Sequence, residues 1–190
     1  MSEPTLGFAI TGSFCTFQKT LAALKALKKA YPKIIPVLSE AAYDTDTRFF
    51  EAAAFRREVE VVCEHEILHT IAQVEPFGPK KLLDALIVAP CTGNTLAKLA
   101  NGIADGPVTL ACKSHLRNGR PVILAISSND ALSGNAESIG RLLNRTHYYF
   151  VPFGQDDAQQ KPRSMVAAFE KLPETVAAAL RGEQLQPMLL

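Results

Sequence analysis

The sequence has few cysteines, and they lack the spacings that tie cysteines into a metal site or a disulfide framework. Four are scattered along the chain, and no two form a C-x-x-C pair. This spacing indicates neither a zinc site nor a set of disulfides. We therefore expect reduced, buried or half-buried thiols at Cys15, Cys63, Cys91 and Cys112.

Long apolar runs and a targeting segment are also missing. No stretch approaches the ~20 apolar residues that a membrane span needs. The first residues, Met-Ser-Glu-Pro, lack the basic region of a signal peptide. The net charge of +1 gives no argument for nucleic acid or a membrane surface as a partner. We expect a cytoplasmic chain that binds neither.

Two catalytic signatures are absent as well. The first turn is no G-x-G-x-x-G fingerprint, so it does not indicate a dinucleotide fold, and no nucleophile elbow with a Ser-His-Asp set is visible. The letters H-E-x-x-H do occur at residues 65–69, on a predicted helix. A zinc protease also needs a third ligand and a cleft, and only His115 and His147 remain. We favour an exposed helix face over a metal site.

The sequence does contain a regular alternation of apolar strands and amphipathic helices. Its 190 residues predict one domain, residues 1–190, without linker or repeat. The alternation predicts a three-layer, doubly wound α/β fold with a mostly parallel, Rossmann- or flavodoxin-like sheet. Strands are expected at residues 6–10, 34–38, 85–89, 121–126 and 148–151, with residues 59–62 as an extra strand or a linking segment. Helices are expected at residues 14–31, 45–57, 96–103, 105–118, 136–144 and 164–181.

The chain is organised around the stretch Ala89-Pro90-Cys91-Thr92-Gly93-Asn94-Thr95. It is a short polar elbow between strand and helix that offers two threonine hydroxyls and an asparagine amide. The helix start adds unpaired N–H groups and the positive end of the dipole, which attract phosphate or the polar edge of a flat heterocycle. The alternative is a plain turn whose threonines only cap the helix.

Two further strand ends carry small, hydroxyl-rich turns. In Thr11-Gly12-Ser13, the glycine lets the backbone approach a ligand, and the serine can cap the helix or donate to a phosphate. Ser39 ends the second strand and can reach the same phosphate. Ligands bind at the carboxyl ends of parallel strands. These turns and the elbow therefore predict a mononucleotide phosphate site rather than a metal or a nucleophile. The alternative at Thr11-Gly12-Ser13 is a simple N-cap.

Cationic side chains in loops are candidates for binding an anionic substrate. Arg48 lies at a predicted helix start, where a guanidinium opposes the dipole. Its alternative is a surface arginine paired with Asp44 or Glu51. A long polar loop follows the strand at residues 148–151 and contains Lys161 and Arg163. Loops of this length are often functional.

The elbow and its surroundings resemble a known family. Residues 90–105 resemble the PASANT-type segment of the flavoprotein family, which includes FMN-dependent cysteine decarboxylases and flavin prenyltransferases. Residues 10–13 and Ser39 match the family's phosphate-binding positions. The resemblance covers nearly the whole chain, with supporting stretches at residues 11–16, 45–49, 75–80, 127–132, 150–157 and 184–187.

The resemblance implies FMN as the cofactor. It places the cofactor site on Thr11, Gly12, Ser13, Ser39, Thr92, Gly93, Asn94, Thr95 and Ser127. The supporting stretches are most similar to the B subunits of a two-subunit oxidoreductase of spore-forming bacteria, which makes the pyridine dicarboxylate stored in spores. This similarity implies a dicarboxylate substrate, an A subunit that carries NAD(P), and a homo-oligomer, trimeric or dodecameric, in the mother cell. A dicarboxylate needs cations, for which the candidates are Arg48, Lys113, Lys161 and Arg163.

Two working parts of the family are missing from this chain. The decarboxylases carry a PxMNxxMW segment, and nothing like it follows Pro121. The prenyltransferases hold a substrate phosphate with an arginine where this chain has Ser127. These departures keep two alternatives open. One is a non-catalytic stabilising or regulatory subunit with a vestigial flavin site, and the other is an FMN-dependent cysteine-type decarboxylase. No catalytic residue is assigned from the sequence.

Overall fold

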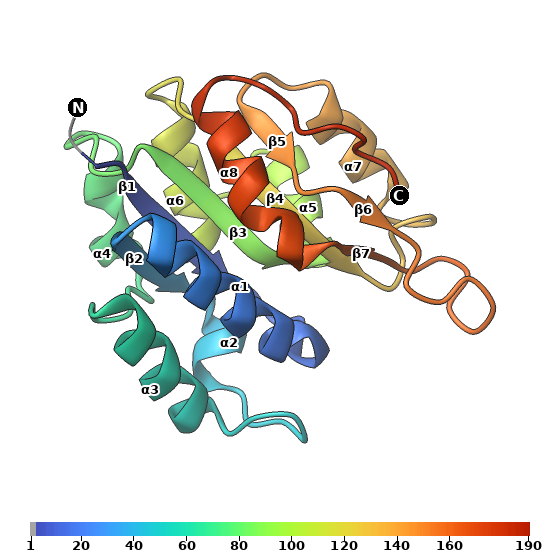
Figure 1. Ribbon diagram of the computed structural model, residues 1–190, viewed down its shortest axis with the longest axis horizontal. Coiled ribbons are helices and arrows are strands. Elements are labelled where there is room, and N and C mark those ends of the chain that lie inside the picture. The colour runs from blue at the N-terminus through green and yellow to red at the C-terminus, as the bar shows by residue number, and fades with distance from the viewer. Residues whose placement is uncertain (1–2) are drawn as a thin grey trace.

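A seven-stranded, mostly parallel sheet forms the middle layer of the fold, which a computed structural model describes for residues 3–190 (Figure 1). The strand order is β2-β1-β3-β4-β7-β6, and β5 pairs with β4 off this path. Strand β7 pairs antiparallel with β4 on one side and with β6 on the other, and the remaining pairs of described strands are parallel. The strands are β1 Thr5–Ile10, β2 Lys33–Leu38, β3 Ala85–Cys91, β4 Val122–Ser128, β5 Tyr148–Phe150, β6 Phe153–Gly154 and β7 Met165–Ala167.

Helices cover both faces of this sheet, which confirms the predicted three-layer, doubly wound α/β class. In Figure 1, α1 and α8 lie on one face, and α5 and α6 lie on the other. The α-helices are α1 Phe17–Ala30, α2 Glu40–Asp44, α3 Ala52–Cys63, α4 Ile71–Val74, α5 Gly93–Ala100, α6 Pro107–Leu116, α7 Ala136–Leu143 and α8 Leu172–Leu180. Short 3-10 turns lie at Phe14–Thr16, Glu75–Phe77 and Phe169–Lys171.

The sequence places the core between these layers. Every residue of β3 and β4 is buried, as expected for central parallel strands that are covered on both faces. Helix α1 buries Phe17, Leu21 and Leu24, which recur every three or four residues on one side of the helix. The ring of Phe17 stacks on Phe55 of α3 at 4.1 Å between ring centroids. This contact fastens α3 to the layer formed by α1.

The predicted last helix, residues 164–181, is wrong over residues 164–171. Residues Met165–Ala167 form β7, which pairs with the end of β4 through Ser127↔Val166 and Ser128↔Met165. Strand β5 pairs with β4 only at Val122–Leu124. The backbone groups at the end of β4 therefore need other partners, and β7 supplies them. Helix α8 begins only at Leu172.

The segment after β2 also differs from the prediction. The predicted helix over residues 45–57 is wrong at its start, because α2 ends at Asp44 and α3 begins at Ala52. Asp46 still reaches α3, and its carboxylate accepts a hydrogen bond from the Ala52 N–H at 2.8 Å. The strand or link predicted at residues 59–62 is also wrong, because these residues extend α3 and bury Val59 on its inner face.

The histidine pair and one cysteine also differ from the prediction. His65 and His69 follow α3 in a loop, so the helix predicted under the H-E-x-x-H letters is wrong. Within residues 3–190, no group of three or more metal-ligating side chains comes together. Cys63, Cys91 and Cys112 are buried as predicted, whereas Cys15 is exposed. None of the described helices is long and apolar enough to span a membrane.

Each outer strand of the sheet has a partner that is not a full strand. Beside β2, the Leu68 N–H donates to the Pro36 carbonyl, and the Leu68 carbonyl accepts from the Leu38 N–H. Beside β5, the side-chain amide of Gln184 accepts from the Phe150 N–H and donates to its carbonyl. Beside β6, the Phe153 N–H donates to the Met188 carbonyl, and the Phe153 carbonyl accepts from Leu190.

A buried histidine on α6 links the stability of the fold to pH. His115 is fully buried; its Nε2 donates to the Pro121 carbonyl at 3.1 Å, and its Nδ1 has no partner among the described residues. Burial lowers the pKa of His115 to about 4, because the interior disfavours the charged ring. The unfolded chain therefore binds a proton at higher pH than the folded chain does, and stability falls as pH drops from about 6.5 towards 4.

We expect the free energy of unfolding to fall by roughly 2 kcal/mol between pH 7 and pH 5 through His115 alone. Denaturant unfolding at the two pH values measures this loss, and His115→Phe should remove it. The Pro121 carbonyl also accepts from the Leu86 N–H, so the variant leaves no unpaired acceptor. An equal fall in the wild type and the variant would assign the pH dependence to other groups.

Candidate functional site

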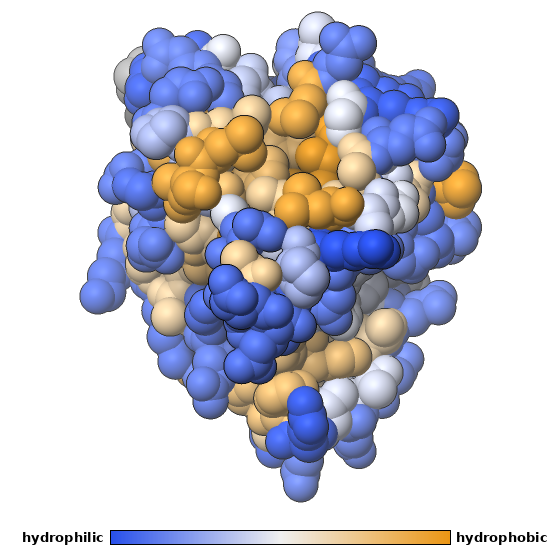
Figure 2. Space-filling model, turned by 90° about the vertical axis from the view of Figure 1, so that its right-hand side faces the viewer, coloured by the Kyte–Doolittle hydropathy of each residue, from blue (hydrophilic) through white to orange (hydrophobic). Residues whose placement is uncertain are grey.

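A cavity of about 420 Å³ lies at the carboxyl ends of the parallel strands. It opens where the order of the strands reverses, because β1 continues to β2 on one side and β3 continues to β4 on the other. Such switch points are the usual ligand sites of open α/β sheets. The cavity gathers six of the nine predicted cofactor residues, which are Thr11, Gly12, Ser39, Thr92, Asn94 and Thr95. Figure 2 views the molecule from the side towards which β1 and β3 run, and much of that surface is polar.

A buried threonine joins the two strand ends that flank the switch point. The hydroxyl of Thr11, at the end of β1, donates to the Pro90 carbonyl at 2.8 Å. The same oxygen accepts a hydrogen bond from the Thr92 N–H at 3.1 Å. Thr11 is only 2% exposed, so these bonds fix the elbow against β1. The β1 turn and the elbow are therefore held together, as predicted, by hydrogen bonds between the Thr11 hydroxyl and backbone groups of the elbow.

The elbow is followed at once by α5, which begins earlier than predicted. The prediction of residues 96–103 is wrong at both ends, because the helix runs from Gly93 to Ala100. Thr92 is its N-cap and accepts from the Thr95 N–H at 3.3 Å, and the hydroxyls of Thr92 and Thr95 lie 3.0 Å apart. The threonines therefore do cap the helix, as the alternative interpretation held, and they also line the cavity.

Asn94 does not cap the helix. It lies in the first turn of α5, on the cavity wall, and is exposed. No hydrogen bond of its side chain is found among residues 3–190. Its amide therefore keeps both donor and acceptor atoms for a ligand.

Gly93 has a packing role at the elbow. A Cβ built on it would clash with the side-chain amide nitrogen of Asn135 and lie 2.8 Å from the hydroxyl of Ser128. Both of these side chains donate to the same carboxylate oxygen of Asp130, at 2.7 and 2.5 Å. The hydrogen bond from Ser128 has the largest effect in lowering the pKa of Asp130, and the hydrogen bond from Asn135 lowers it further. Gly93 thus lets α5 approach a hydrogen-bonded group that holds the end of β4.

Ser13 and Ser127 are brought together but do not line the cavity. Their hydroxyls share a hydrogen bond of 2.7 Å between the β1 turn and the end of β4. Ser13 precedes the first helical turn without capping it, so that part of the prediction is wrong. Ser39 does cap a helix, because its hydroxyl accepts from the Ala42 N–H at the start of α2. Three helices, α2, α5 and α6, therefore begin at the cavity.

A charged pair on the cavity wall is not among the predicted site residues. Lys98 of α5 lies one helical turn after Asn94, and its ammonium group donates to Asp105 at 2.9 Å. The hydrogen bond from Lys98 lowers the pKa of Asp105, so this carboxyl stays ionised. The i, i+4 spacing from Asn94 was the available signal for Lys98. Asp105 is brought close only by the loop before α6.

The four predicted substrate cations do not meet at this cavity. Arg48 lies in the loop after α2, with its guanidinium 4.8 Å above the ring of Phe49, and it has no ion pair among the described residues. Arg48 therefore does not lie at a helix start, so that prediction is wrong. Lys113 lines a separate cavity beside α6. Lys161 and Arg163 line a third one in the long loop, where Lys161 also pairs with Asp156 at 3.4 Å.

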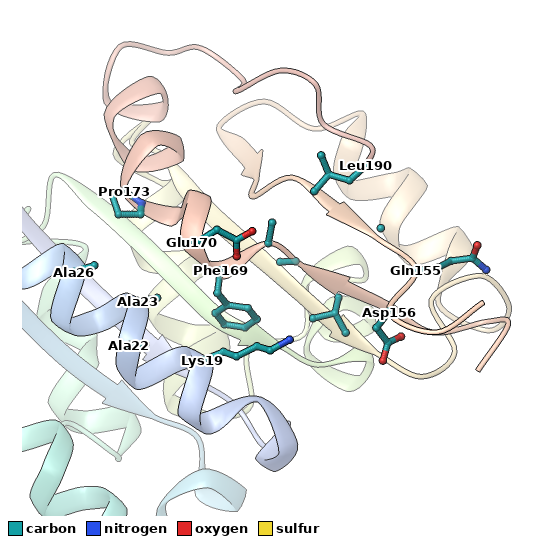
Figure 3. A pocket seen from close by; sticks show the side chains of 14 residues that line it. Lys19, Ala22, Ala23, Ala26, Gln155, Asp156, Phe169, Glu170, Pro173 and Leu190 are labelled. Carbon is teal, nitrogen blue, oxygen red and sulfur yellow. The ribbon is translucent and has the colours of Figure 1, made fainter. Parts of the chain in front are cut away.

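Another cavity, of about 670 Å³, lies away from all of the predicted cofactor residues. Figure 3 shows it between α1 and the end of the chain, with small alanine side chains on one side and Leu190 on the other. Phe169 forms part of its wall, and among residues 3–190 the charged side chains that line it are Lys19, Asp156 and Glu170. None of the strand ends or helix starts that line the switch-point cavity contributes to this other cavity.

The structure is that of an α/β protein with a cavity at the switch point of its sheet. Residues 1–153 match the family model named Flavoprotein, so the chain belongs to the flavoprotein family. It is 42% identical over 185 residues to the B subunit of dipicolinate synthase from Bacillus subtilis (strain 168), covering 97% of this chain and 92% of the relative.

Solved structures agree with this relationship. The crystal structure of the dipicolinate synthase B subunit from Bacillus halodurans is 43% identical, with a TM-score of 0.91, and the match covers 100% of this chain and 97% of that one. The FMN-dependent cysteine decarboxylase SpaF is 20% identical, with a TM-score of 0.71, and the match covers 94% of this chain and 96% of that one. At that identity, the likeness to SpaF extends to the fold alone.

Proposed function

We propose that this chain is the FMN-binding subunit of a two-subunit enzyme that oxidises dihydrodipicolinate to dipicolinate. The observation that carries the proposal is the cavity at the switch point, where residues from three strand ends meet. Similarity to two dipicolinate synthase B subunits supplies the substrate class. Membership of the flavoprotein family supplies the cofactor class.

The cavity fits a flavin mononucleotide chemically. Phosphate suits the end where the hydroxyls of Ser39, Thr92 and Thr95 lie close to the N-termini of α2 and α5. The pyrimidine edge of a flavin presents both donors and acceptors, which matches the amide of Asn94. The volume of about 420 Å³ lies within the range of small-molecule sites.

FMN, when bound, supplies a two-electron acceptor, which the aromatisation of a dihydropyridine requires. The residues of this chain would hold and orient the reactants. Thr11 fixes the elbow against β1, and the Lys98–Asp105 pair places an ammonium group on the cavity wall. The A subunit of the enzyme, which carries oxidised NAD(P), would receive the two electrons that the substrate loses. In this proposal it binds the present chain, because the relatives are B subunits by name.

The first test is whether the purified chain binds FMN. Titration of FMN with the protein should quench flavin fluorescence, with a Kd of about 10 µM or tighter. Riboflavin, which lacks the phosphate, should bind more weakly. Absence of quenching at tens of micromolar FMN, or equal binding of riboflavin, would contradict the phosphate site. Light scattering of the same sample would measure the proposed trimer or dodecamer.

The lining of the switch-point cavity also supports the non-catalytic alternative. The cavity is lined by no histidine or cysteine, and of its two acids, Glu40 and Asp105, the second is paired with Lys98. A general base is therefore not evident. Assay of the A subunit with and without this chain separates the two functions, because full activity of that subunit on its own favours a stabilising or regulatory role for the present chain. Release of carbon dioxide from a thiol-bearing substrate would instead support the cysteine-type decarboxylase.

A further inference from the structure

A second cavity, of about 350 Å³, lies between α5, α6 and the start of β5. We call it the basic cavity and define it by three cations, Lys113, Arg117 and Arg145, and three apolar or aromatic side chains, Leu99, Ile103 and Tyr148. It shares only Thr109 with the cavity at the switch point. It is therefore a distinct site, and the proposed function does not use it.

The charges around the basic cavity are all positive. None of Lys113, Arg117 and Arg145 forms an ion pair with any residue among 3–190, and no carboxylate lines the cavity. Lys113 and Arg117 lie four residues apart, at the end of α6, where like charges repel. Their position at a helix C-terminus favours cations, but it does not explain why a third cation faces the same hollow.

That third cation is held in place by the protein backbone. The guanidinium of Arg145 donates to the carbonyls of Leu99 and Ala100 at 3.0 and 2.8 Å, at the end of α5. Carbonyl acceptors leave its charge uncompensated. Arg145 is therefore a fixed positive group, although it is exposed. The exposed side chains of Lys113 and Arg117 have no hydrogen bond among residues 3–190 and can move towards a ligand.

The remaining wall of the basic cavity is apolar. Leu99 is buried, Tyr148 is half-buried, and Ile103 is 46% exposed. A large aliphatic side chain that is exposed beside a hollow offers contact area for the body of a ligand. Apolar walls with a few charged groups are the common composition of small-molecule sites, and the volume falls within their range.

We propose that the basic cavity binds a small organic anion, with its flat or compact apolar body against Leu99, Ile103 and Tyr148. Its carboxylate groups lie among Lys113, Arg117 and Arg145, where charge-assisted hydrogen bonds are the strongest available. A twofold contact between two copies of this surface would place cation against cation. The charge pattern therefore favours a small anionic ligand over the same surface of a second copy.

Calorimetric titration of the full-length chain with pyridine-2,6-dicarboxylate tests the site. We expect saturable binding with a Kd below about 1 mM, both with and without saturating FMN. The double variant Lys113→Gln with Arg117→Gln should weaken binding at least about tenfold. The matched control is Arg141→Gln with Lys171→Gln, which removes two cations that pair with Glu137 and Glu174 outside the cavity. It should bind like the wild type.

Inorganic phosphate is the probe for charge alone, and it should bind at least about tenfold more weakly than the pyridine dicarboxylate. Equal binding of phosphate, an unchanged Kd in the double variant or no binding at millimolar concentration would each overturn the proposal. Loss of binding on saturation with FMN would also overturn it, by assigning the ligand to the switch-point cavity. If the chain does not bind FMN, the titration without FMN still tests the basic cavity, so the two proposals can fail independently.

Discussion

Gly93→Val should lower the free energy of unfolding by about 1–3 kcal/mol, the usual cost of overpacking, and should abolish FMN binding. Any Cβ at this position clashes with the side chain of Asn135 and crowds that of Ser128. These side chains cannot move away without giving up their hydrogen bonds to the Asp130 carboxylate. The start of α5 must therefore shift, and Thr92, Asn94 and Thr95 shift with it.

Denaturant unfolding and FMN titration measure the two effects of Gly93→Val. Gly93→Ala should give an intermediate loss, because it adds the clashing Cβ without further branches. Gly140→Ala is the matched control. Its Cβ would meet nothing within 4 Å on α7, so the change should stabilise the chain by up to about 1 kcal/mol. Wild-type stability and FMN affinity in Gly93→Val would show that α5 does not depend on this close approach.

Asn94→Asp is expected to weaken FMN binding at least tenfold, a loss of about 1.4 kcal/mol, while the fold stays stable. An ionised carboxylate accepts hydrogen bonds but cannot donate them, and it repels both phosphate and a dicarboxylate. The N-cap of α5 is Thr92, so the cap is unaffected. A negative charge in the first turn also interacts favourably with the helix dipole, by about 0.3–1 kcal/mol.

Comparison with Asn94→Ala separates the two causes of this loss. The alanine variant removes the amide without adding charge, so it should bind FMN better than the aspartate variant and worse than the wild type. Thermal unfolding of all three proteins checks that the fold is intact. FMN affinity and synthase activity that stay unchanged in Asn94→Asp would remove Asn94 from the ligand site.

The sheet and the position of the switch-point cavity can be predicted from the sequence because both follow from local patterns. Apolar runs such as residues 85–89 predict buried parallel strands, and parallel strands place Gly12, Ser39 and Thr92 at one edge whatever the details of the loops. The Lys98–Asp105 ion pair cannot be predicted in this way, because it depends on how residues 101–106 fold back between α5 and α6. The hydrogen bond between Ser13 and Ser127 likewise depends on distant strand ends.

The errors have a common physical origin. Local patterns extend the last helix back over Met165–Ala167, whereas the end of β4 offers these residues backbone partners. Residues 59–62 have the β-branched composition of a strand, but Phe55 and Val59 bury one helical face against the core. The basic cavity is not visible in local patterns for the same reason, since only the packing of α7, β5 and α6 brings Arg145 and Lys113 to one cavity. Tertiary contacts, which local patterns do not report, decided these positions.

The substitute partners of the outer strands bear on how this protein behaves at high concentration. An open strand edge is a template on which a second copy can add its own strand, the first step of edge-to-edge aggregation. Leu68 blocks β2, where Pro36 also lacks an N–H to offer. Gln184 occupies the edge of β5 with a single side-chain amide, and Met188 and Leu190 occupy that of β6. An assembly of these chains should therefore form through side-chain surfaces, with each sheet ending at its own edge.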